Sequence, residues 1–269
     1  MAGGLGSRMQ NFLLEVTKGN VAGHYPVNVF GRNIDIDSIA IADIWDGGHT
    51  GDVSLIWVAP TQARVHNLIS SSTSDDGDPA GVGARTVEVL YLPDWDTKEA
   101  SVVVTMNGTT NVVLPSLVMI NKMEVITKGG TNSNVGVIKA TAVTDNTITA
   151  KIRVGQGRTQ QAILGIPSSQ TFYIGRLYAN SNKGGGAAGL IDMSLLCNPE
   201  ADSELKNFNV FHPFALAEGG TSALTISFYV PKIVAGAAII KIQGLSGSAN
   251  MDVNAGFDGI LVDNTIGAL

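Results

Sequence analysis

The chain has 269 residues, a formal net charge of −6 and a sequence pI of about 5.1. Only 15% of its residues are charged and 32 are glycine, unlike disordered chains, which are highly charged. The 17 Lys and Arg residues are scattered, which argues against a nucleic-acid partner, because neutralising phosphates needs clustered cations. No apolar run approaches the roughly 18 residues that span a bilayer, so we expect no membrane protein.

The hydropathy and the cysteine content bear on assembly and on the cellular compartment. The mean hydropathy of +0.20 is high for a freely soluble monomer, and we assign the apolar excess to subunit interfaces, whose cores are poor in charge. With Cys197 as the one cysteine, no intramolecular disulfide can form. Residues 1–8 lack a basic segment followed by an apolar one, so we expect no signal peptide and synthesis in the cytoplasm.

The first 70 residues differ in pattern from the rest, and we place the end of this region near residue 80. They contain Trp45, Trp57 and many turn signals such as Gly19-Asn20. Short strand-like pieces at 27–30, 39–44 and 53–58 alternate with these turns, and no long helical period appears. We therefore predict an extended, irregular N-terminal arm over residues 1–80 that docks onto a neighbouring molecule.

Residues 81–269 read as a series of short strands separated by Gly, Asn, Pro and Ser turns. Asn107-Gly108 and Thr144-Asp145-Asn146 each stand between two β-like runs and predict hairpins. We expect no amphipathic helix of about 12 or more residues. The fold class is therefore all-β, an antiparallel β-sandwich or jelly roll, and residues 180–190 are either a linker that subdivides it or a loop within one sandwich. The predicted strands cover residues 86–92, 101–106, 109–114, 118–127, 135–143, 147–154, 161–166, 171–179, 190–197, 208–216, 223–230, 237–242 and 257–262.

One acidic cluster, formed by Asp75, Asp76 and Asp78, has the residue type that calcium prefers. Its spacing is not that of an EF-hand, and no glutamate follows at the required offset. A solvated turn is the favoured interpretation, and metal binding at these three residues stays open.

No combination of residues stands out as catalytic. The histidines are far apart, and Gly155-Gln156-Gly157 lacks the ending of a phosphate-binding loop. Cys197 lies in an apolar run, as a small buried hydrophobe would. The carboxylate pairs Asp94/Asp96 and Asp43/Asp46 show no distinguishing context. We predict no enzymatic activity and no cofactor.

Five aromatic or cationic side chains are candidates for contact with a partner: Phe30, Arg32, Trp45, Trp57 and Trp95. Trp95 stands at an expected loop tip, where it either anchors a partner or a glycan or covers one end of the core. Both interpretations stay open at this point.

Five segments spread over nearly the whole chain resemble, in this order, a family of virion structural proteins of tailed phages that is common in marine and environmental phage genomes. The resemblance implies a part of the phage particle, without a fixed location and without catalytic residues. The segments are Gly31-Arg32-Asn33-x-Asp35-x-Asp37 with Ile44-Trp45-Asp46-Gly47-Gly48, then Asp76-Gly77-Asp78-Pro79-Ala80-Gly81-x-Gly83-Ala84-Arg85-Thr86-Val87, Val104-Thr105-Met106-Asn107-Gly108, Gly155-Gln156-Gly157-Arg158-Thr159, and Asn254-Ala255-Gly256-Phe257-Asp258 with Leu261-Val262.

These observations lead us to expect an outer head decoration or head-fibre protein. It would dock on the major capsid protein through its N-terminal arm and form a homo-oligomer, with a trimer favoured because closed cyclic assembly is the default. The alternative is a tail-associated or receptor-binding protein that contacts a host surface glycan. A glycan-cleaving enzyme is the third hypothesis.

Overall fold

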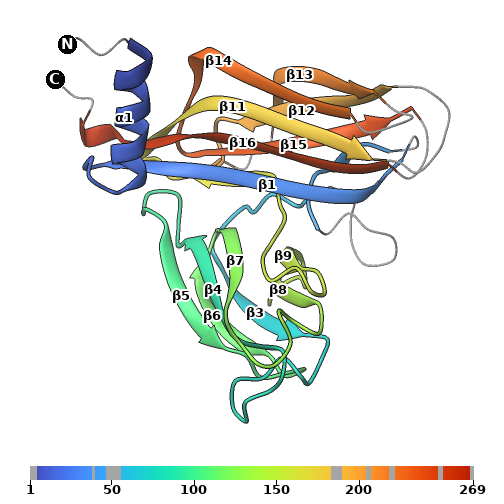
Figure 1. Ribbon diagram of the computed structural model, residues 1–269. Helices are drawn as coiled ribbons and strands as arrows, with labels where there is room; N and C mark the ends of the chain where they lie inside the picture. The colour runs from blue at the N-terminus through green and yellow to red at the C-terminus, as the bar shows by residue number, and fades with distance from the viewer. Residues whose placement is uncertain are drawn as a thin grey trace.

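The structure is a computed structural model that describes residues 5–37, 40–46, 56–182, 190–203, 207–217, 222–247 and 251–266, with only the backbone described for 5–10. Within these residues the chain forms sixteen strands, one α-helix, α1 (Leu5–Thr17), and a short 3-10 helix (Asn264–Ile266) (Figure 1). Every pairing between the named strands is antiparallel. The predicted all-β class is confirmed, whereas the sandwich or jelly-roll class stays a prediction.

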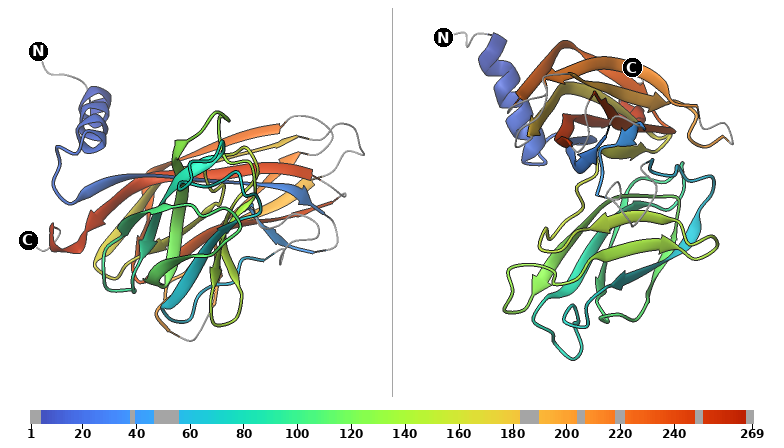
Figure 2. Two further views of the ribbon diagram at one scale, coloured as in Figure 1. Left: turned by 90° about the horizontal axis from the view of Figure 1, so that it is seen from below. Right: turned by 90° about the vertical axis from the view of Figure 1, so that its right-hand side faces the viewer.

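The strands form two lobes, which Figure 1 and the right-hand view of Figure 2 show one above the other. Lobe I has one sheet of order β1-β16-β11-β14 and one of order β10-β15-β12-β13, in which β2 also pairs with β15. Its strands are β1 (His24–Ile36), β2 (Ala42–Asp43), β10 (Ile163–Ile166), β11 (Gln170–Asn182), β12 (Leu190–Asn198), β13 (Asn209–Ala217), β14 (Ser222–Ala235), β15 (Ala238–Ser246) and β16 (Met251–Asp263).

Lobe II has one sheet of order β6-β3-β8-β9 and one of order β5-β4-β7. Since the chain enters lobe II after β2 and returns to lobe I at β10, lobe II is an insertion within lobe I. Its strands are β3 (Arg64–Ser70), β4 (Ala84–Leu92), β5 (Ala100–Thr105), β6 (Val112–Leu117), β7 (Met119–Lys128), β8 (Ile138–Ala142) and β9 (Ile148–Ile152).

The N-terminal region is not the irregular arm that the sequence predicts. β1 pairs with β16 along most of its length, with Val27 and Val29 against the core of lobe I and Ile36 fully buried in it. This pairing joins residues more than two hundred positions apart, and local turn signals do not reveal it. The boundary expected near residue 80 falls between β3 and β4, whose Leu68 and Val87 share one core.

Helix α1 corrects the expectation that the chain has no helix of this length. Residues Leu5, Met9, Phe12, Leu13 and Val16 recur at the i, i+4, i+7, i+8 and i+11 spacing of one apolar helix face, so the signal was present in the sequence and was missed. The helix ends where Gly19 takes a positive φ of 77° and its N–H donates to the Val16 carbonyl at 2.9 Å. Glycine is favoured at such a helix terminus because it has no Cβ.

Of the two predicted hairpins, one is confirmed and one is wrong. Thr144-Asp145-Asn146 joins the paired strands β8 and β9, and Asn146 has a φ of 59°. Asn107-Gly108 joins β5 and β6, but β5 pairs with β4 and β6 pairs with β3 in the other sheet. Gly108 does adopt the positive φ of a turn, at 53°. The chain passes from one sheet to the other at this turn and does not form a hairpin there.

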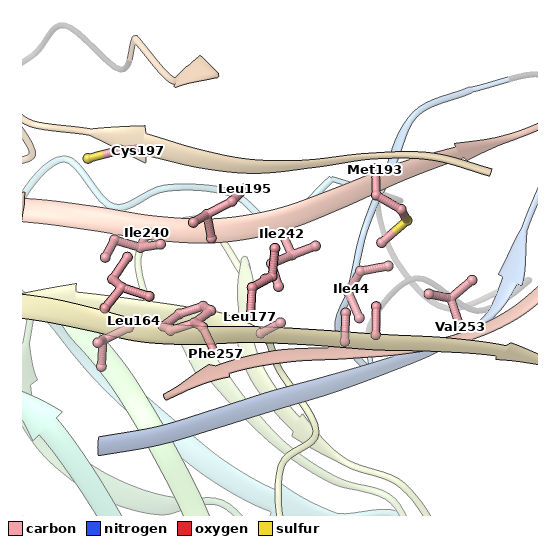
Figure 3. Close-up of a cluster of buried hydrophobic side chains, with 14 of the residues drawn as sticks. Ile44, Leu164, Leu177, Met193, Leu195, Cys197, Ile240, Ile242, Val253 and Phe257 are labelled. Atoms are coloured by element: carbon pink, nitrogen blue, oxygen red, sulfur yellow. The ribbon is translucent and has the colours of Figure 1, made fainter. Parts of the chain in front are cut away.

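The main hydrophobic core lies between the two sheets of lobe I (Figure 3). Leu177 and Phe257 enter it from one sheet, and Leu195 and Ile240 from the other. Cys197 is buried at the edge of this core, and burial raises the pKa of its thiol to about 11. A second core fills lobe II between its two sheets.

A third core joins the two lobes. Trp45, Ile163 and Ile239 of lobe I pack there with Trp57 and Trp95 of lobe II. The connecting segments cross closely: the Ala162 N–H donates to the Ile44 carbonyl at 2.8 Å. A Cβ on Gly31 would overlap both of these groups, so glycine is required for β1 to pass over the crossing.

Candidate functional site

The structure places the three tryptophans of the sequence-predicted interaction set in the interior. Trp45 is 1%, Trp57 2% and Trp95 7% exposed, and all three belong to the core between the lobes. Trp57 Nε1–H also donates to the Thr149 carbonyl at 3.0 Å. This burial does not fit the expected role as anchors for a partner, and for Trp95 it matches the interpretation that the ring covers the end of a core. The three rings connect the lobes to each other.

Phe30 and Arg32 lie partly exposed on the outer face of the β1-β16-β11-β14 sheet. The Arg158 guanidinium stacks over the Phe30 ring at 4.5 Å from its centroid. Arg32 donates through Nε to Asp252 at 3.0 Å and makes a second bond through Nη2, and this hydrogen bonding raises the Arg32 pKa. Phe30 and Arg32 both line an open hollow on this face. Each side chain already has a partner within the chain, Arg158 for Phe30 and Asp252 for Arg32.

Asp75 has a structural role in lobe II. Its carboxylate is fully buried and accepts four hydrogen bonds, one from the Ser70 hydroxyl at 2.6 Å and three from the Ala84, Val135 and Gly136 N–H groups at 2.8 Å each. These bonds hold together the end of β3, the start of β4 and the segment before β8.

The other two members of the acidic cluster sit in a turn. The Asp78 N–H donates to Asp76 Oδ1 at 2.9 Å, as Asp residues commonly do in turns. Within the described part of the chain, no group of three His, Cys, Asp or Glu side chains is placed to hold a metal ion.

The carboxylate pairs show structural contacts. Asp94 Oδ1 accepts the N–H groups of Asp96 and Thr97 at 2.9 and 2.6 Å, which is a capped turn. Asp43 is buried and pairs with the buried Lys241 ammonium at 2.8 Å.

Asp46, the partner of Asp43 in the second pair, is 3% exposed and accepts the Gln160 N–H at 3.0 Å. Burial raises the pKa of its carboxyl to about 7. Asp46 follows β2 and Gln160 precedes β10, so this carboxyl lies where the two segments that connect the lobes meet.

A cleft of about 350 Å³ lies between the lobes. Tyr25 of β1, which is 42% exposed, and Lys98 of lobe II stand at its wall. The Lys98 ammonium bonds to Asp263 Oδ2 at 2.6 Å, and Gln170 Nε2–H donates to the other oxygen at 2.9 Å. Burial raises the pKa of Asp263, but these bonds outweigh it and the net shift is downward. The cleft is thus crossed by an ion pair that links the lobes.

Two exposed apolar surfaces were not identified from the sequence. The first is helix α1, where Val16 is buried but Phe12, Leu13 and Leu14 are 44%, 50% and 50% exposed. Apolar residues therefore occupy more than the one side of the helix that packs on its own chain. The helical spacing of the apolar residues at 5, 9, 12, 13 and 16 was the available signal, because an amphipathic helix has one apolar stripe, and Leu14 lies outside that stripe.

The second surface, which we name the β13–β14 patch, consists of Val210, Tyr229, Val230 and Ile233. Their exposed fractions are 61%, 101%, 76% and 58%. The two strands meet beneath the patch, where the Lys232 ammonium donates to the Phe211 carbonyl at 3.1 Å. The sequence showed strands here but not which residues face outward, because both alternating sets contain apolar residues.

None of the protein-family models and none of the curated proteins matches this chain. A solved structure described as "Structure of infectious bursal disease virus Gx strain" is similar at 8% identity, over 89% of this chain and 69% of that chain, with a TM-score of 0.17. A similarity at this score carries no argument about fold or function. Among the described residues no helix is long and apolar enough to cross a membrane.

Proposed function

We propose that this chain is a non-catalytic structural subunit of a tailed-phage particle that works as a homo-oligomer, with a trimer favoured. The β13–β14 patch is the observation that carries the assembly role. Single exposed apolar residues are ordinary, and it is the presence of four of them on two neighbouring edge strands that supports an interaction role here. The resemblance of the sequence to phage virion proteins supports the particle as the place of assembly, after synthesis in the host cytoplasm.

Within the particle, we place the chain on the outside of the head as a decoration or head-fibre protein. Helix α1 takes the docking role that the sequence analysis assigned to an irregular arm. Leu13 and Leu14 are half exposed, and an apolar helix face laid into a groove of a partner is a common mode of binding. The paired sheets of each lobe support a proposal that both lobes are antiparallel β-sandwiches.

Capsid docking can be tested with purified protein and particles that lack it. We expect the wild-type protein to co-sediment with these particles, and the double variant Leu13→Glu/Leu14→Glu to bind at least about tenfold more weakly, because charges disfavour an apolar interface core. Val113→Glu is a matched control, since Val113 is 67% exposed on lobe II. Wild-type protein that never binds heads, or immunogold that labels only tails, would overturn the head location.

The interlobe cleft favours the second candidate function, a tail-associated protein that adsorbs to the host. An exposed tyrosine ring with Lys98 and Glu99 beside it combines the apolar and polar groups that fix a small ligand such as a surface glycan. A phage that loses this protein and still adsorbs normally excludes this role.

A further inference from the structure

We propose that Asp43 and Lys241 are a self-modification site, at which the folded chain joins the Asp43 carboxyl carbon to Lys241 Nζ in an amide bond. Both groups are buried, with 0% of the Asp43 side chain and 5% of the Lys241 side chain exposed. The inference concerns the covalent structure of the chain and does not rest on the proposed function.

The register of two neighbouring strands brings the pair together. β2 pairs with β15 so that Asp43 stands opposite Gln243, and Lys241 lies two residues earlier on β15, on the same face of the strand. Such diagonal neighbours are within reach of each other when one side chain is long. The Lys241 ammonium accordingly lies 2.8 Å from Asp43 Oδ2.

The surroundings of the pair are apolar and aromatic. Ile240 and Ile242, on either side of Lys241, point into the core of lobe I (Figure 3), so Lys241 and the Asp43 that it contacts lie on the opposite face of the sheet. There the Lys241 ammonium is 4.5 Å from the centroid of the Phe208 ring, which packs against the core that joins the lobes. Water is therefore kept away from both charged groups.

Burial makes the ionised form of this pair costly, because a single contact replaces only part of the hydration that two charges lose. Burial raises the pKa of Asp43, and the Lys241 ammonium and the Trp57 N–H offset only part of this rise. Asp43 Oδ1 is buried and has no hydrogen-bond partner within the part of the chain that the structure describes. A neutral carboxyl beside a neutral amine is the pair of reactants from which an amide forms.

The reaction is a condensation that needs no further reactant. A proton passes from the Lys241 ammonium to the Asp43 carboxylate, and the neutral Nζ then attacks Cγ, as desolvated lysine amines do. The Nζ–Cγ bond forms and the Cγ–Oδ1 bond breaks. Oδ1 leaves as water, whose two protons both come from the former ammonium, and a neutral amide remains.

The structure places the reacting atoms and stabilises the charge that develops. A nitrogen 2.8 Å from Oδ2 is about 3–4 Å from the carboxyl carbon, close to a near-attack geometry. The Trp57 N–H donates to Oδ2 at 2.8 Å, so it stabilises negative charge on this oxygen during attack and later holds the amide oxygen. The exclusion of water disfavours the reverse reaction, which is hydrolysis.

The amide would close a large covalent loop. Asp43 lies in β2, after which the chain enters lobe II, and Lys241 lies in β15, after the chain has returned to lobe I. All of lobe II is therefore inside the loop from 43 to 241. A cross-link of this length restricts the unfolded chain strongly, and it does so in a chain whose single cysteine allows no intramolecular disulfide.

Mass spectrometry of the denatured wild-type chain tests the cross-link. After the folded protein has been kept at neutral pH, we expect its mass to lie below the sequence mass by one water molecule. A proteolytic digest should contain a branched peptide that joins positions 43 and 241. The digest is needed because an Asp-Gly step such as Asp258-Gly259 also loses water when it forms a cyclic imide, but this product is not branched.

Two controls separate the amide from an ordinary ion pair. Lys98 Nζ lies 2.6 Å from Asp263 Oδ2, but 49% of the Lys98 side chain is exposed, so we expect no branched peptide between these positions in the same digest. Lys241→Arg keeps the positive charge but has no amine to react, and it should show the full sequence mass.

The wild-type mass decides the question even if the arginine variant does not fold. Wild-type protein that keeps the full sequence mass after prolonged incubation in the folded state overturns the proposal. A loss of water without a branched peptide at positions 43 and 241 overturns it as well.

Discussion

At the scale of single residues, the buried carboxyl of Asp46 makes the stability of the protein depend on pH. Asp46 lies at the crossing of the lobes, 3% exposed, and burial raises its pKa to about 7 from an ordinary value of 3.8. The Gln160 N–H and the charges of Arg153, Lys151 and Arg32 lower the pKa but do not offset the burial. Between these two pH values the native state holds a proton that the unfolded chain has released.

It follows that Asp46 lowers stability as the pH rises from about 4 to 7, and the full cost is present above pH 7. We expect the free energy of unfolding of Asp46→Asn to exceed that of the wild type by about 2–4 kcal/mol at pH 8, and the two values to be equal near pH 4. The asparagine carbonyl keeps the hydrogen bond from Gln160. Urea titrations of both proteins at the two pH values measure this. If the variant and the wild type differ by the same free energy at pH 4 and at pH 8, the raised pKa is contradicted.

Asp75 shows the opposite use of a buried carboxylate, since each of its oxygens accepts two hydrogen bonds. Asp75→Ala leaves the Ala84, Val135 and Gly136 N–H groups without this acceptor. We expect a loss of about 3–5 kcal/mol in the free energy of unfolding. Thermal unfolding checks this against the exposed Asp202→Ala, for which a change within about 0.5 kcal/mol is expected.

At the scale of elements, the terminal strands of the two sheets of lobe I differ in whether the rest of the molecule covers them. β1 and β10 border the interlobe cleft, whereas β13 and β14 carry the exposed patch. All four strands contain β-branched residues, with Val and Ile in β1 and β14, Ile in β10 and Val in β13, so strand propensity does not separate the covered edges from the uncovered ones. Edge position and a bulge in the pairing of β14 with β11, not composition, expose Tyr229 and Val230. The prediction at this scale belongs to α1, where we expect Leu13→Glu/Leu14→Glu to weaken binding to the capsid.

At the scale of the whole molecule, stability depends on the core that joins the lobes. Trp95 is 7% exposed and packs there with Trp45 and Trp57. We expect Trp95→Ala to cost about 3–5 kcal/mol, because removing a large buried ring leaves a cavity. Calorimetry should show two separate transitions in the variant where the wild type shows coupled unfolding. A single unchanged transition contradicts the role of this core in coupling the lobes.

Local sequence determined the strand-rich class and many of the strands. The alternation in residues 86–92 corresponds to β4 at Ala84–Leu92, and the run 171–179 lies within β11 at Gln170–Asn182. The expected strand at 27–30 lies within β1. Of the expected strand at 39–44, residue 39 lies outside the described residues and only Ala42–Asp43 form a strand. Of the expected strand at 53–58, residues 53–55 lie outside the described residues and 56–58 form no strand. The subdivision near 180–190 falls largely on residues 183–189, which also lie outside them.

Alternation and turn chemistry act between near neighbours, so the all-β class and the Asn146 hairpin could be predicted from the sequence alone. Only the tertiary structure decided that β1 pairs with β16, that lobe II is inserted in lobe I, and that Trp45, Trp57 and Trp95 are buried between the lobes. It also decided that Tyr229 faces outward. These features depend on contacts between residues far apart in the chain, and a side chain's neighbours, not its type, determine whether it forms a core or a surface.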